Sequence, residues 1–378
     1  MRVREEREGG TVRRVQLLEG DDRPVEMVDR FLAHLSDRGL SPNTRRAYAY
    51  DLRYLFTFLE SASLPLDAFG PADALRFLGF LRQQPTRRPA QRLGLSVLTG
   101  GERPVPLLSP ASVNRVLAGV SSFFEWAIAA EEYRHGESPM QRRPDPALAR
   151  VPERHQPFMG RASRQRPMRR AVGVKVPMRL PRPMSASDLE AFLGSLRRLR
   201  DLALFLLMLD GGLRPGEALA LHLEDVAYGR RRVVVRKRDD HPKGARGKSR
   251  AERFVDLHEP RTLEAVSRYV MHERPPEATS PFVFLVGGSR ANRLEPLGYD
   301  AVARLFSRRM DALGIRTPDK TPHALRHTHA TAMWEAGMRE LSLQKRLGHA
   351  SPDSTTVYTR ISDDAVLADY VQALGGPR

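Results

Sequence analysis

The sequence contains no cysteine, which excludes disulfide bonds, thiolate metal sites and a cysteine nucleophile. It also lacks a long apolar run, because the longest, residues 202–209, is far shorter than the roughly 18 residues needed to cross a bilayer. The first residues are charged and include no apolar stretch of the kind found in a secretory signal. We therefore expect a cytoplasmic protein without a membrane span.

Positive charge is the strongest compositional feature. The chain has 62 Lys and Arg against 45 Asp and Glu, a formal net charge of +17 and a pI of about 10.8. An excess of this size indicates a polyanionic partner such as nucleic acid. With 378 residues, the chain is also long enough for two domains with separate cores, since most domains contain ~100–200 residues.

The N-terminal part of the chain has a helical pattern. Over residues 25–126, apolar side chains recur at helical spacing. Ser41 and Pro42 supply the N-cap and first-turn proline of one helix, and Leu75, Leu78 and Leu81 predict another. We expect a disordered tail over residues 1–20 and a helical domain over residues 21–135.

A basic, proline-rich segment follows, which we assign as a linker over residues 136–184. Residues 142–183 contain twelve Arg or Lys against two acidic residues, a composition that does not build a core. Such a segment is either a solvated spacer or a cationic strap along a phosphate backbone. Residues 185–378 then predict a second domain, mainly helical, with an antiparallel hairpin formed by the β-branched runs at 232–236 and 254–257.

The first chemical motif places an arginine where one helix ends and the next begins. Arg214 follows Gly211 and Gly212 and precedes Pro215, which suits the first turn of a helix. Free backbone amides at a helix start favour anions. Glu217, three residues later, is spaced to hold the guanidinium of Arg214 from one helical turn away.

A second motif begins another helix at Thr321 and Pro322. His323 and Arg326 are three residues apart, so an imidazole and a guanidinium share a face and can reach one phosphate together. His323 and His327 also have the spacing of a metal site. The zinc protease pattern requires a glutamate directly after the first histidine, and Ala324 stands there. We expect no metal.

The last motif joins His349, which follows Gly348, to Tyr358 nine residues later. A tyrosine near the C-terminal end of a chain is usually a packing or surface ring, so Tyr358 becomes a candidate nucleophile only through its place after the other motifs. In the order and spacing of these motifs, the sequence resembles the tyrosine recombinase, or phage integrase, family. The matching residues are Arg214 with Glu217, His323 with Arg326, Gly348 with His349, and Tyr358.

The resemblance covers residues 185–358 and implies a fold and an activity. It implies a SAM-like helical core-binding domain, which residues 25–126 resemble, and an α+β catalytic domain, so that the fold is mainly α with a small antiparallel sheet. It further implies that Tyr358 attacks a DNA phosphate held by Arg214, Arg326 and His349, with His323 serving proton transfer. The expected partners are double-stranded DNA and three further copies of the chain, as a homotetramer on two DNA sites.

The family also has a lysine on the hairpin, and this sequence offers Lys237, Lys243 and Lys248. We choose Lys248 because it stands eight residues before Asp256, close to the end of the returning strand, as the family lysine commonly does. The connection is longer than in chromosome-dimer-resolving members of the Xer type, which favours a mobile-element integrase or transposase.

Three rival functions are weaker. Gly247-Lys248-Ser249 ends like a nucleotide-binding P-loop, but Pro242 stands where the pattern requires glycine, so no nucleotide cofactor is expected. The separate helical domain and the spacing from His349 to Tyr358 argue against a type IB topoisomerase. A catalytically idle DNA-binding protein of the same fold is disfavoured because every expected catalytic position is filled.

Overall fold

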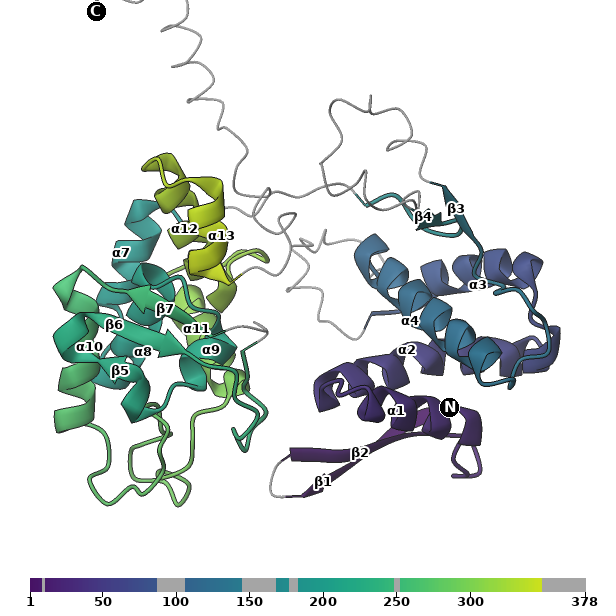
Figure 1. Ribbon diagram of the computed structural model, residues 1–378, viewed down its shortest axis with the longest axis horizontal. Coiled ribbons are helices and arrows are strands. Elements are labelled where there is room, and N and C mark those ends of the chain that lie inside the picture. The colour runs from purple at the N-terminus through teal and green to yellow at the C-terminus, as the bar shows by residue number, and fades with distance from the viewer. Residues whose placement is uncertain (9–10, 87–105, 145–167, 177–182, 248–251, 349–378) are drawn as a thin grey trace, which may run out of the picture. The chain divides into compact units, whose positions relative to one another are not determined.

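The computed structural model describes residues 1–8, 11–86, 106–144, 168–176, 183–247 and 252–348 (Figure 1). The chain divides into two compact units, Met1–Met178 and Arg179–Arg378. Regular structure is mostly helical, with antiparallel sheets of two, two and three strands over those ranges. This confirms the predicted fold class. No helix in the described part of the chain is long and apolar enough to cross a membrane.

Unit Met1–Met178 is built around a set of helices: α1 (Glu26–Asp37), α2 (Pro42–Ser61), α3 (Pro71–Gln83) and α4 (Pro110–Ala129), with a 3-10 turn at Leu66–Ala68. Helix α2 begins as predicted, because the Ser41 hydroxyl accepts a hydrogen bond from the backbone N–H of Thr44 and Pro42 occupies the first turn. Ser109 caps α4 in the same way, through the backbone N–H of Ser112.

The helix predicted from Leu75, Leu78 and Leu81 is present as α3, but these leucines do not all face the core. Leu75 is 62% exposed, whereas Ala74, Phe77 and Leu81 are buried. Positions 74, 77 and 81 share one face of the helix, and Leu75 lies about 100° around the axis from Ala74. The ring of Phe77, packed against Phe58 and Phe69, sets which face turns inward.

The N-terminal segment is an ordered hairpin, so the prediction of a disordered tail over residues 1–20 is corrected. Strands β1 (Arg2–Glu8) and β2 (Thr11–Leu18) pair antiparallel. Residues 15–18 of β2 are all buried, and Val15 and Leu17 belong to the core of this unit. In β1, the exposed Arg2, Arg4 and Glu6 alternate with half-buried residues, the pattern of a strand with one solvent-facing side. Glu5 adds an ion pair to Arg46 of α2 at 2.5 Å. The high charge of the segment obscured this alternation.

Both ends of the basic segment at 136–184 are also ordered and belong to the first unit. Strands β3 (Arg142–Pro144) and β4 (Met168–Arg170) pair with each other, and Met140 and Val172 on either side are buried in the core of the helices. The side chain of Asn114 on α4 makes two hydrogen bonds with the backbone of Val174, at 2.8 and 2.9 Å. These two ends of the segment are therefore packed parts of the first unit and not a linker.

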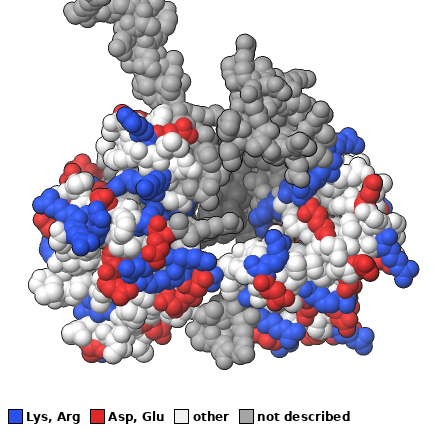
Figure 2. Space-filling view, viewed as in Figure 1, with Lys and Arg blue, Asp and Glu red and all other residues white. Residues whose placement is uncertain are grey.

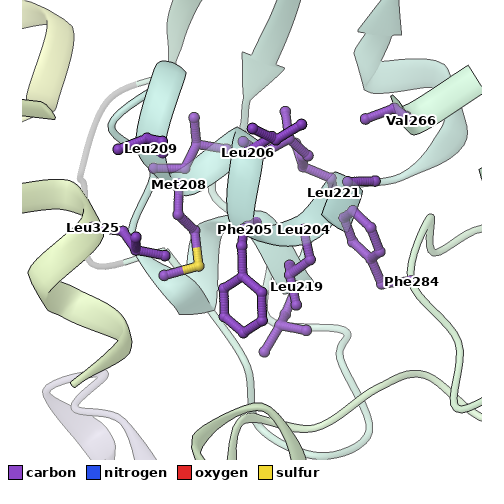
Figure 3. Close-up of a cluster of buried hydrophobic side chains, with 14 of the residues drawn as sticks. Leu204, Phe205, Leu206, Met208, Leu209, Leu219, Leu221, Val266, Phe284 and Leu325 are labelled. Atoms are coloured by element: carbon purple, nitrogen blue, oxygen red, sulfur yellow. The ribbon is translucent and has the colours of Figure 1, made fainter. Parts of the chain in front are cut away.

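Unit Arg179–Arg378 packs its helices around α8 (Leu199–Asp210), whose residues from Ala203 to Leu209 are all buried. Figure 3 shows Phe205 and Met208 of α8 in a cluster with Val266 and Leu325 from other helices. The remaining elements are α7 (Ala186–Gly194), α9 (Pro215–Leu219), β5 (Val226–Ala227), β6 (Arg232–Val235), β7 (Arg253–Asp256), α10 (Pro260–His272), α11 (Tyr299–Ala312), α12 (Pro322–Glu335) and α13 (Glu340–Leu347), with 3-10 turns at Leu223–Asp225 and Tyr228–Arg230.

The predicted hairpin is present, with Val233 of β6 opposite Val255 of β7. β5 adds a third strand beside β6. On the visible face of each unit, Lys and Arg side chains are interleaved with Asp and Glu, so the positive excess forms no uniform basic surface there (Figure 2).

Candidate active site

Arg214 lies at the tight turn between α8 and α9. Gly212 has a φ of +63°, and a Cβ built there would lie 2.5 Å from Cδ2 of His329, so only glycine fits both the backbone and the space. Arg214 is the N-cap residue of α9, and its backbone N–H donates to Oε2 of Glu217 at 2.9 Å. Nη1 of Arg214 donates to Oε1 of the same carboxylate at 2.7 Å. Glu217 thus holds Arg214 as the sequence predicted.

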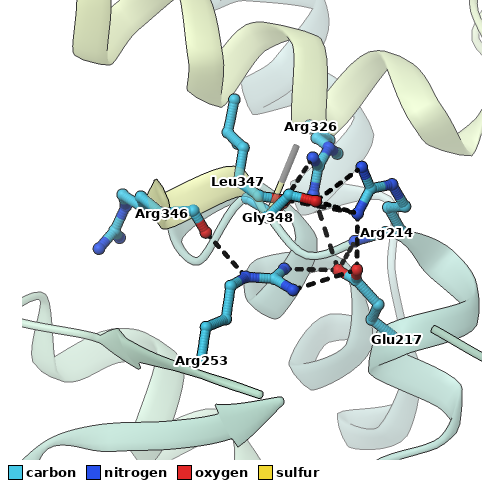
Figure 4. Close-up of polar contacts among 8 residues, drawn as sticks. Arg214, Glu217, Arg253, Arg326, Arg346, Leu347 and Gly348 are labelled. Atoms are coloured by element: carbon cyan, nitrogen blue, oxygen red, sulfur yellow. Dashed lines mark hydrogen bonds and ion pairs between the residues drawn. The ribbon is translucent and has the colours of Figure 1, made fainter. Parts of the chain in front are cut away.

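The carboxylate of Glu217 is fully buried and is shared by three arginines (Figure 4). Arg253 donates to it at 2.6 and 3.2 Å, and Nη1 of Arg326 lies 3.7 Å from Oε2. Burial alone raises the pKa of Glu217, but the hydrogen bond and charge of Arg253, with the charges of Arg326 and Arg214, outweigh it and lower the pKa. The carboxylate is therefore ionised, and the cluster keeps an excess of positive charge.

The same three arginines bind the C-terminal end of α13. Successive carbonyl oxygens accept from different arginines: Arg346 O from Nε of Arg253 at 2.9 Å, Leu347 O from Nη2 of Arg326 at 2.7 Å, and Gly348 O from Arg214 at 3.4 Å. A helix C-terminus carries partial negative charge, so guanidinium groups are favourable there. The cluster, which we call the arginine cluster (Arg214, Glu217, Arg253 and Arg326), fixes where the chain leaves α13.

The structure thus brings Arg214 and Arg326 together from segments more than a hundred residues apart, since Arg326 also donates to Gly212 O at 2.7 Å across a separation of 114 residues. His323 is exposed on the first turn of α12, one turn before the buried Arg326. Lys248, His349 and Tyr358 lie outside the described residues. Gly247, which directly precedes Lys248, lies close to the cluster, because a Cβ built at Gly247 would lie 3.5 Å from Cγ of Glu217.

The two alternative hairpin lysines are placed differently. Nζ of Lys243 forms an ion pair with Oε2 of Glu295 at 2.9 Å. Lys237 is exposed beyond the end of β6. Among the described residues, no group of three or more His, Asp or Glu is arranged to hold a metal ion.

Sequence reasoning missed two arginines of this region, Arg253 and Arg346. Arg346 donates from Nε to Nε2 of His329 at 3.0 Å and from its terminal nitrogens to the carbonyls of Asp256 and Asp210. Burial, with the charge of Arg346, lowers the pKa of His329 to about 4, so this ring is neutral and its Nε2 can accept. The available signal was strand alternation, because Arg253 shares the inward face of β7 with Val255.

Comparison with known proteins identifies the class. Residues 182–364 match the model of the phage integrase family, and residues 28–131 match that of the phage integrase N-terminal SAM-like domain. The chain belongs to the phage integrase family of tyrosine recombinases, enzymes that break and rejoin DNA strands at specific sites.

The relatives include both transposases and recombinases of the Xer type. Transposase A from transposon Tn554 of Staphylococcus aureus is 26% identical, over 94% of this chain and 92% of its own length. Tyrosine recombinase XerC of Rhodospirillum centenum is 30% identical, over 92% of this chain and 86% of its own length. The Tn1549 transposon integrase in complex with transposon right end DNA has the same fold, with a TM-score of 0.58 and 18% identity, covering 92% of this chain and 99% of that one.

Proposed function

We propose that this chain is the recombinase of a mobile DNA element and that Tyr358 is its nucleophile. The observation that carries the proposal is the arginine cluster, which binds the end of α13 one residue before His349 and ten residues before Tyr358. Arg214 and Arg326, which we predict to hold one phosphate, share the carboxylate of Glu217. Both also bind the end of α13, from which the chain continues to Tyr358.

The proposed chemistry is an exchange of phosphodiester bonds. The Tyr358 oxygen attacks phosphorus, forms a 3′-phosphotyrosine bond and expels the 5′ oxygen, to which Lys248 donates a proton. Arg214 and Arg326, with His349, stabilise the charge on the non-bridging oxygens, and His323 takes the phenol proton. Because the phosphotyrosine keeps the energy of the broken bond, attack by another 5′ hydroxyl rejoins the strand without ATP.

The proposed partner is double-stranded DNA, read by a homotetramer that holds two sites. The net charge of +17 supplies the counterion-releasing contacts that dominate DNA affinity. Several solved relatives, including the Tn1549 integrase, are described as complexes with DNA. We place the enzyme in the cytoplasm.

The choice of a mobile element over Xer-like resolution of chromosome dimers depends on the hairpin. Seventeen residues, from Arg236 to Glu252, separate β6 from β7, whereas dimer-resolving members have a short Gly-Lys-Gly connection. His241 anchors the longer connection: it is buried, its ring meets Phe282 at 4.8 Å, and Nδ1 accepts from the backbone N–H of Lys243 at 3.1 Å. Xer-like resolution remains the alternative function, and a catalytically idle DNA-binding role is the third.

Covalent capture tests both the chemistry and the role. The full chain is incubated with a pool of nicked duplexes of randomised sequence, so that cleavage releases a short 5′-hydroxyl strand and traps the enzyme on DNA. We expect a denaturant-resistant adduct that is absent in Tyr358→Phe and slower by about 10²–10³-fold in Arg214→Ala, by analogy with lost oxyanion donors. An adduct that persists in Tyr358→Phe overturns the assignment.

Sequencing the captured strands separates the roles. Captured sites that match both ends of a mobile segment support the proposal, whereas a single chromosomal site supports dimer resolution. Binding of the pool without any adduct supports the idle DNA-binding protein. Exchange between two captured sites distinguishes recombination from relaxation by a topoisomerase.

A further inference from the structure

Arg253 is a buried cation of the arginine cluster and, unlike Arg214 and Arg326, takes no part in the proposed chemistry. It is the first residue of β7 and is 7% exposed, although neighbouring Phe254 turns its ring outward and is 62% exposed. A buried guanidinium is costly unless its donors are satisfied. Its position in the strand therefore requires partners, and the structure supplies them.

Over the described part of the chain, the hydrogen bonds of Arg253 go to Glu217 and to the end of α13. Nη1 and Nη2 donate to the two oxygens of Glu217 at 3.2 and 2.6 Å, a fork on one carboxylate. Nε donates to the carbonyl of Arg346 at 2.9 Å. The guanidinium also lies directly under Gly348, where a Cβ would come within 2.7 Å of Nη1. One side chain thus joins the hairpin, the carboxylate and the end of α13.

We propose that Arg253 is a positioning residue for strand cleavage, which holds the Glu217 carboxylate against Arg214 and fixes the end of α13 beside it. This inference rests on the proposed function of Arg214 as a phosphate-binding arginine. All three guanidinium nitrogens of Arg253 donate to Glu217 or Arg346, so Arg253 does not touch the phosphate in this scheme (Figure 4). Nη2 of Arg214, by contrast, makes only a 3.4 Å contact with Gly348 O among the described residues.

A positioning role for Arg253 and a purely structural role predict different pH dependence of strand cleavage, because Arg253 controls the charge of Glu217. The groups that face the carboxylate are Arg253 from β7, Arg214 from the start of α9, Arg326 from α12 and the uncharged backbone at Gly247. Burial opposes ionisation, and Arg253 makes the largest opposing contribution. Without Arg253, the pKa of Glu217 rises, so acid protonates the carboxyl and Arg214 loses its charged partner.

The experiment measures single-turnover formation of the covalent adduct from pH 6 to pH 8.5, on one nicked duplex from the capture experiment. Each variant rate is divided by the parent rate at the same pH, which cancels the titration of groups that both proteins share. We expect Arg253→Met to be slower by about 10–100-fold at pH 8.5. We expect its relative rate to fall further as the pH is lowered, by up to about tenfold per pH unit once the carboxyl protonates.

Two further variants identify Glu217 as the titrating group. Arg253→Lys restores the charge without the fork, so we expect an intermediate rate with the flat relative profile of the parent. The double variant Arg253→Met with Glu217→Gln has no carboxyl to titrate, so its relative profile is also flat. A slope that persists in the double variant contradicts the role of Glu217.

Arg200→Met is the matched control for lost stability. Arg200 is also a buried arginine that forks onto a carboxylate, Asp201, at 2.6 and 2.8 Å and donates to backbone carbonyls, including that of Val286. We expect a loss of stability but a flat relative profile. If Arg253→Met is as fast as the parent at every pH while Arg214→Ala is inactive, the positioning role is wrong. If Arg214→Ala itself cleaves normally, the proposed function fails instead.

Discussion

Asp51 in the first unit gives a prediction whose direction runs against the usual view of ion pairs. This residue of α2 is 3% exposed, and a Cβ built at Gly119 of α4 would lie 3.1 Å from its own Cβ. Nη1 of Arg115 lies 2.6 Å from Oδ1, but the Arg115 side chain is 53% exposed. Burial raises the pKa of Asp51 to about 6, and the charge of Arg115 offsets only part of that rise. The ionised carboxylate therefore destabilises the fold at neutral pH.

The size of the effect follows from linkage. The pKa rises from 3.8 to about 6 on folding, and each pKa unit corresponds to about 1.4 kcal/mol, so the full penalty is about 3 kcal/mol. The folded protein binds this proton more tightly than the unfolded chain does. The penalty is thus complete above the folded pKa and disappears as the pH falls toward 3.8. We expect Asp51→Asn to raise the free energy of unfolding by about 2–3 kcal/mol at pH 7.5 and by less than about 1 kcal/mol at pH 4.

Tryptophan fluorescence during urea unfolding measures this in the full chain. The sequence has two tryptophans, Trp126 and Trp334, one in each unit, so a Trp334→Phe background leaves Trp126 as the reporter of the first unit. Asp73→Asn is the control, because Asp73 also pairs with an arginine but accepts from the backbone N–H of Gly70 at 3.1 Å. That variant should gain no stability. If Asp51→Asn is no more stable than its parent at pH 7.5, or if the difference does not shrink in acid, the reasoning is refuted.

Two further predictions concern the arginine cluster. Glu217→Ala should lower the free energy of unfolding of the second unit by about 3–5 kcal/mol, because three guanidinium groups lose their shared buried partner. Trp334 fluorescence reports this unfolding, and a loss below about 1 kcal/mol would contradict the prediction. Gly348→Ala should be less stable than Gly337→Ala, since both positions have positive φ but only the Cβ at 348 meets Arg253, at 2.7 Å. The same adduct assay should show slower cleavage for Gly348→Ala alone, and equal rates would exclude the contact.

Much of the fold could be predicted because local signals and packing agree. Helix α12 begins at Pro322 as predicted, although the Thr321 side chain makes no capping hydrogen bond. Strands β6 and β7 pair where two β-branched runs predict a hairpin. The N-terminal hairpin was missed because its strands carry many charges. Only β1 alternates exposed with half-buried residues, and its exposed positions are Arg or Glu. The ends of the basic segment were missed because only isolated residues such as Met140 and Val172 anchor them.

Contacts of the candidate site could be predicted where both residues belong to one motif. Contacts between residues from distant segments could not. Glu217 and Arg214 are three residues apart, so helical geometry alone relates them. Arg253 meets Glu217 only through the packing of β7 against α9 and α13, which no local pattern reports. The positions of Lys248, His349 and Tyr358 stay predictions.

The arginine cluster also has a consequence for biosynthesis. Arg214 and the carbonyl of Gly348 that it contacts are 134 residues apart, so a ribosome that adds ~5–20 residues per second needs roughly 7–27 s between them. Throughout that interval the nascent polypeptide carries the guanidinium of Arg214 without the Gly348 carbonyl that it contacts in the folded protein. The arginine cluster can thus be completed only after Gly348 has been added to the chain.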